Sequence, residues 1–134
     1  MSYEYLQVDI AEHVALVTMN NPPVNAQNRP FRDELTAIFD ELSDREDVRA
    51  IILTGAGKVF SAGADIKERQ GIKVGAGFYR QHNRVTRESF YAILECDKPV
   101  IGALNGAALG AGLALAACCD ILIASENAVL GMPE

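Results

Sequence analysis

Several features that mark other protein classes are scarce or missing in this chain of 134 residues. It contains no tryptophan, and its three cysteines (Cys96, Cys118 and Cys119) are too few for a disulfide framework, so we expect reduced thiols and a cytoplasmic location. The two histidines, His13 and His82, have no metal-ligand spacing with any cysteine, histidine or carboxylate cluster. No metal site is therefore expected.

The chain also lacks any concentrated basic stretch. Its 18 acidic residues outnumber 12 basic ones and give a net charge of −6, which does not suit a nucleic-acid partner. The first residues, MSYEYLQVDIAEH, have neither the basic n-region nor the apolar h-region of a secretory signal. There is no GxxxxGK[ST] phosphate loop, and Ser61 does not lie in a GxSxG motif, so neither a P-loop enzyme nor a serine hydrolase is indicated.

One uncharged stretch, residues 100–119, is long enough to cross a bilayer. However, Pro99 precedes it, Asn105-Gly106 is a turn signal in its middle, and no basic cluster flanks either end. We therefore expect a buried strand, a turn and a buried helix here, and no membrane partner. A membrane helix is the alternative that this pattern leaves open.

The composition that remains is that of a globular protein, with 49% apolar and 22% charged residues. Apolar runs bounded by turn residues predict strands at 13–19, 49–54, 98–104 and 120–124. Helical periodicity predicts helices at 30–42, 78–94 and 110–118, the first of them burying Phe31, Leu35, Ile38, Phe39 and Leu42. This alternation of strands and helices indicates a single α/β domain over residues 1–134.

The helix predicted at 78–94 also carries one of the two histidines, His82. Val85, Ser89 and Ile93 mark one side of this helix, and arginines mark the other. His82 stands in a polar stretch, and we expect it at the surface.

Two glycine- and alanine-rich segments, 59–68 and 105–112, each follow a predicted strand. Their small side chains leave backbone N–H groups accessible, and two such donors aimed at one point would form an oxyanion hole. The simpler interpretation is that both are tight strand-to-helix turns. We expect Asp65 and Asp120 to be structural acids of a turn and a helix end, and the pair Cys118-Cys119 to be buried packing.

Four ordered motifs carry a resemblance to a known family. NPPVNA (21–26), FSAGADIKE (60–68), KPVIGALNGAALGAGLALAACCDILIAS (98–125) and GMPE (131–134) closely resemble the enoyl-CoA hydratase/isomerase (crotonase) superfamily, from about Val8 to the last residue. The resemblance implies a spiral of repeated ββα units. The family domain is longer, so residues 1–134 would be its N-terminal part, without the C-terminal helical part.

The same resemblance implies roles for individual residues. The N–H groups of Ala64 and Ala111 would be the two oxyanion-hole donors that stabilise a thioester enolate. Contacts to an acyl-CoA substrate are implied for Val24, Ala26, Ala64, Asp65, Ile66, Lys67 and Ala111. No separate cofactor is implied, because coenzyme A is part of the substrate.

Two departures from the family pattern decide the expected chemistry. Ala111 stands where glycine is usual, and Ala114 stands where hydratases carry a glutamate, which leaves Glu134 as the implied catalytic carboxylate. One carboxylate suffices to move a proton between α and γ carbons, so the resemblance favours a Δ3–Δ2 enoyl-CoA isomerase of fatty acid metabolism. The alternatives are an enoyl-CoA hydratase with an altered acid–base group and a non-catalytic acyl-CoA-binding or assembly protein. We expect a homotrimer or hexamer at full length and no activity from residues 1–134 alone.

Overall fold

The computed structural model describes residues 3–69 and 75–133, and within these ranges eight strands form two sheets. The larger sheet has the order β1-β2-β3-β5-β7, in which β1 is antiparallel to β2 and the other pairs are parallel. Its strands are β1 (Leu6–Ala11), β2 (Val14–Met19), β3 (Ala50–Gly55), β5 (Val100–Leu104) and β7 (Ile121–Ala124). The smaller, parallel sheet contains β4 (Val59–Ser61), β6 (Ala107–Leu109) and β8 (Leu130–Gly131).

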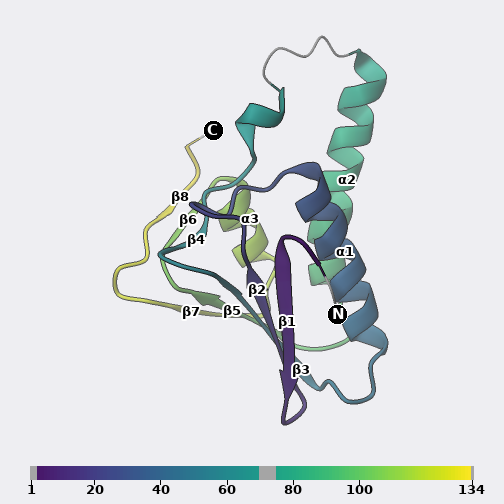
Figure 1. The fold of residues 1–134 in the computed structure, drawn as a ribbon, viewed down its shortest axis with the longest axis vertical. Helices are drawn as coiled ribbons and strands as arrows, with labels where there is room; N and C mark the ends of the chain where they lie inside the picture. Colours follow the sequence, from purple (N-terminus) through teal and green to yellow (C-terminus); the bar gives the residue numbers. More distant parts are fainter. Residues whose placement is uncertain (1–2, 70–74, 134) are drawn as a thin grey trace.

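The helices of the described residues are α1 (Arg29–Asp44), α2 (Ala76–Leu94), α3 (Ala111–Ala117) and the short 3-10 helix η1 (Ile66–Arg69). Figure 1 shows α1 and α2 side by side on one side of the larger sheet. Along the chain, β3, β4 and α2 form one unit, and β5, β6 and α3 form the next. Each unit gives one strand to each sheet and then a helix, which confirms the predicted spiral of ββα units within an α/β fold.

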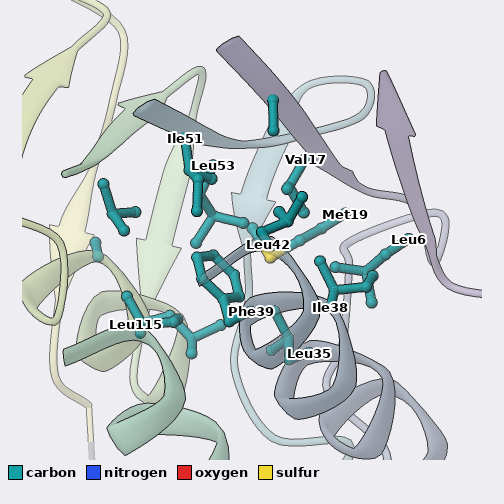
Figure 2. Packing of buried hydrophobic residues seen from close by; sticks show 14 of the residues in the cluster. Leu6, Val17, Met19, Leu35, Ile38, Phe39, Leu42, Ile51, Leu53 and Leu115 are labelled. Atoms are coloured by element: carbon teal, nitrogen blue, oxygen red, sulfur yellow. The ribbon is translucent and has the colours of Figure 1, made fainter. Parts of the chain in front are cut away.

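Local sequence explains why α1 forms and where it packs. The Asn28 side chain accepts a hydrogen bond from the Phe31 N–H at 2.9 Å, and Pro30 lies in the first turn, where no N–H is needed. The apolar positions predicted for this helix, among them Leu35 and Phe39, are completely buried. Figure 2 shows the α1 side chains facing strand residues such as Leu53. This packing makes α1 and the larger sheet the fixed support of the domain.

The structure adds strands that the sequence analysis did not predict. One is β1, which was missed although its apolar residues Leu6, Val8 and Ile10 alternate with polar ones. The others are short: β4 and β6 have three residues each and β8 has two, so no alternation can be read from them. In the uncharged segment 100–119, the predicted strand and helix are confirmed as β5 and α3, with β6 between them. Within the described ranges, no helix is both long enough and apolar enough to cross a membrane.

Candidate active site

The pairing of β4 with β6 brings the two glycine- and alanine-rich segments together. Val59 is the register partner of Ala107, and Ser61 is the partner of Ala108. Because the strands are parallel, the residues that follow them leave the same edge of the small sheet. Ala64 and Ala111 are therefore neighbours in space.

The backbone around Ala64 is held in place by its own hydrogen bonds. The Gln27 N–H donates to the Gly63 carbonyl at 2.8 Å, and the Asp65 N–H donates to the Gln27 carbonyl at 3.1 Å. The Gly63 N–H donates to the Ser61 hydroxyl at 3.2 Å. Among residues 3–69 and 75–133, no acceptor takes the Ala64 N–H, and the bridge between Ala64 and Gln27 uses the Gly63 carbonyl and the Asp65 N–H. That N–H is available to a ligand.

Ala111 offers a second such donor at the start of α3. The first N–H groups of a helix have no intrahelical acceptor. Gly110 turns the chain into the helix with a φ of 54°. Gly63, with a φ of 97°, approaches so closely that a Cβ there would lie 3.1 Å from the Ala111 nitrogen and 2.7 Å from the Leu109 carbonyl oxygen. Only glycine fits at position 63, and its small size lets the two loops meet.

Ala64 and Ala111 both line a cavity of about 270 Å³, together with Ala114. A neighbouring cavity of about 430 Å³ has Ala64 in its wall as well. It is also lined by five other residues implied to contact the substrate: Val24, Ala26, Asp65, Ile66 and Lys67. The structure therefore gathers the predicted residues into two cavities that share Ala64, with Ala111 in the smaller one. Glu134 lies outside the described residues.

The turn at residues 21–26 is fixed against the small sheet by Asn25. This side chain is buried, and its amide group donates to the Val59 carbonyl at 2.8 Å and to the Phe60 carbonyl at 3.2 Å. Its oxygen accepts a hydrogen bond from the Asn21 N–H at 2.9 Å. Asn25 thereby holds Val24 next to the segment that carries Ala64. The asparagine stands in the NPPVNA motif, but nothing in the sequence reveals its long-range partners.

The expectation that His82 lies at the surface is wrong, because this residue is only 5% exposed and lines the smaller cavity. It lies seven residues before Ser89 and eleven before Ile93, so it belongs to the face of α2 that packs inward. The periodicity that marked Ser89 and Ile93 could have found it. Arg32, which was not predicted as a site residue, also lines this cavity and is only 2% exposed. Its guanidinium lies 3.7 Å from the Glu68 carboxylate.

Two acidic residues and two cysteines make local contacts within the fold. The Asp65 carboxylate accepts a hydrogen bond from the Lys67 N–H, and that of Asp120 accepts one from the Val100 N–H, as expected for acids that hold a turn and a helix end. Cys118 and Cys119 are half-buried and pack against the core. Burial raises the pKa of the Cys119 thiol to about 12, so it stays protonated at neutral pH. Across the described ranges, no group of His, Cys, Asp and Glu could hold a metal ion.

Comparison with known proteins identifies the family. Residues 9–134 match the family model of enoyl-CoA hydratase/isomerase. A probable enoyl-CoA hydratase of Bacillus subtilis is 40% identical over 133 residues, which are 96% of this chain and 50% of that relative. A short-chain-enoyl-CoA hydratase of Clostridium acetobutylicum is 43% identical over 123 residues, covering 90% of this chain and 46% of that relative.

Solved structures agree with these relatives. The crystal structure of an enoyl-CoA hydratase/isomerase from Xanthobacter autotrophicus has a TM-score of 0.94 at 32% identity, covering 99% of this chain and 50% of that chain. The chain belongs to the enoyl-CoA hydratase/isomerase family. It spans about half the length of the relatives that it matches.

Ser61 is the subject of the first prediction, because its hydroxyl joins two segments of the site. It donates to the Asn25 carbonyl at 2.8 Å and accepts from the Gln27 side-chain amide at 3.1 Å and from the Gly63 N–H. Replacing Ser61 by alanine in the complete protein leaves buried donors without this acceptor. We expect the free energy of unfolding in urea to fall by about 1–3 kcal/mol.

The exposed Ser125 provides a control for the Ser61 variant. Its replacement by alanine should change the free energy of unfolding by less than about 0.5 kcal/mol. Equal effects of the two substitutions would contradict the assigned role of Ser61.

Proposed function

We propose that the complete protein processes acyl-CoA thioesters by stabilising an enolate at the smaller cavity. The observation that carries this proposal is that Ala64 and Ala111 both line one small cavity. We assign their N–H groups as the two donors. A thioester carbonyl oxygen placed between them would gain negative charge as the α-proton leaves. Donors already held in position stabilise that charge without reorganising, which lowers the barrier to proton abstraction.

The larger cavity suits the coenzyme A part of the substrate. Its apolar wall, which includes Val24, Ala26 and Ile66, can contact the pantetheine chain, and the exposed Lys67 can pair with a phosphate group. Because Ala64 lies in both cavities, a thioester bound in the larger one can present its carbonyl to the smaller one. Coenzyme A is then part of the substrate, and we propose no separate cofactor.

We propose Glu134 as the general base and an isomerase-type reaction between 3-enoyl and 2-enoyl thioesters. Ala114 lines the smaller cavity with a methyl group, so this position supplies no second carboxylate for hydration. The alternative is a hydratase with an altered acid–base group, which the similarity to a probable enoyl-CoA hydratase and a short-chain-enoyl-CoA hydratase favours. Assays with crotonyl-CoA and 3-hexenoyl-CoA distinguish the two reactions. A protein that binds both substrates but turns over neither would be a binding or assembly protein.

We also propose that the complete protein is a cytoplasmic homotrimer or hexamer of fatty acid metabolism. In residues 3–69 and 75–133, the three cysteines are free, in keeping with a reducing compartment. The edge strand β7 carries exposed apolar residues, among them Ile123, which is 64% exposed. Such a surface is normally covered by further protein.

The coenzyme A contact is tested by reversing the charge of Lys67. In the complete protein, Lys67→Glu should weaken butyryl-CoA binding by about 1 kcal/mol, as expected for an exposed charge pair. The loss should shrink at high salt, because ions screen exposed charges. Isothermal titration calorimetry measures both values.

Lys58 is an exposed lysine outside the larger cavity and gives the matched control. The variant Lys58→Glu changes the net charge equally but should retain wild-type affinity. If both variants bind butyryl-CoA equally well at low salt, the proposed contact between Lys67 and coenzyme A is contradicted.

The general base is tested by Glu134→Gln in the complete protein. This variant should keep its affinity for butyryl-CoA while kcat for 3-hexenoyl-CoA falls by roughly 10²–10⁴, the usual scale for a lost acid–base group. Residues 1–134 alone should be inactive, because there Glu134 also bears the terminal carboxylate. Substantial turnover by the glutamine variant would show that another residue is the base.

A further inference from the structure

The burial of His82 places an imidazole in the wall of the smaller cavity. This wall also contains Ala64 and Ala111. The His82 ring stacks on Phe78, with the centroids 6.1 Å apart and the planes 20° apart. One turn later, the Thr86 hydroxyl donates to the His82 carbonyl at 2.9 Å. Helix α2 thus contributes His82 to the same cavity wall as the two proposed donors.

The side chains that line this cavity differ in their ability to transfer a proton. Its described wall consists of Arg32, Ala64, His82, Asn83, Thr86, Phe90, Gly110, Ala111, Ala114 and Met132. Arginine stays protonated at all physiological pH values, and asparagine and threonine do not titrate. Histidine is the side chain that most often gives or takes a proton in general acid–base catalysis. Within the described part of the wall, His82 is the one side chain suited to proton transfer.

We propose that His82 is a second acid–base catalytic residue and enables this site to hydrate 2-enoyl thioesters as well as isomerise 3-enoyl thioesters. The inference rests on the proposed enolate function. It would give the reaction two proton-transfer groups, although Ala114 supplies none. The first is the general base proposed above, and the second is the imidazole.

The proposed step moves one proton at each reacting carbon. The water oxygen bonds to the β-carbon, one water proton passes to the general base, and the electrons of the double bond move into the enolate. The N–H bond of the His82 imidazolium then breaks, and its proton bonds to the α-carbon through the enolate electrons. The product is a 3-hydroxyacyl thioester. The neutral imidazole regains a proton from the protonated base through water.

The test compares the wild-type complete protein with His82→Gln, using crotonyl-CoA for hydration, 3-hexenoyl-CoA for isomerisation and butyryl-CoA for binding. We expect kcat for hydration to fall by roughly 10²–10⁴. The fall in isomerisation should be smaller, because one carboxylate suffices for that reaction. Affinity for butyryl-CoA should change less than threefold. The exposed Gln81, which precedes His82 on α2, gives the matched control Gln81→Ala, which should keep both activities.

A second variant, His82→Ala, distinguishes a loss of proton transfer from a loss of packing. In His82→Ala, added imidazole should restore hydration in proportion to its concentration, which lost packing alone would not allow. If His82→Gln hydrates crotonyl-CoA as fast as the wild type does, the role of His82 is overturned. The same holds if the wild-type protein isomerises 3-hexenoyl-CoA but does not hydrate crotonyl-CoA. Neither result contradicts the proposed enolate function. Absence of both reactions and of butyryl-CoA binding in the wild type overturns the proposed function together with this inference.

Discussion

Ser61 and Ala108 are register partners where β4 pairs with β6, and the candidate site depends on this pairing. The two parallel strands release their following loops at one edge of the small sheet, where Gly63 closely approaches the Ala111 nitrogen. A side chain at position 63 would push the loops apart. That Ala64 and Ala111 line one cavity is thus a consequence of strand pairing and of one glycine with a left-handed φ.

The predictable part of the fold is the part encoded by local periodicity. Helix α1 was found from its apolar spacing and its proline-containing first turn, and β5 and β7 from continuous apolar runs. The small sheet was not predicted, because strands of two or three residues have no readable period. Its order is set by contacts between residues that are far apart in the chain.

The candidate site also has a part that the sequence predicted and a part that it did not. Motif resemblance named Ala64 and Ala111, and the structure brings them to one cavity. The hydrogen bonds of Gln27 and Ser61 could not be inferred, since they join segments more than thirty residues apart. His82 was misplaced because its polar sequence neighbours outweighed its helical position, although packing of α2 against α1 decides which face is buried.

The central claim is that the Ala64 and Ala111 N–H groups polarise a thioester carbonyl. Infrared difference spectroscopy of butyryl-CoA labelled with ¹³C at that carbonyl measures this directly in the complete protein. We predict that the carbonyl stretch moves to lower frequency on binding and that part of this shift is lost in Ala111→Pro, since proline removes one donor yet is accepted at the first position of a helix. A bound carbonyl that absorbs at its frequency in water, while the affinity for butyryl-CoA is retained, would contradict the account.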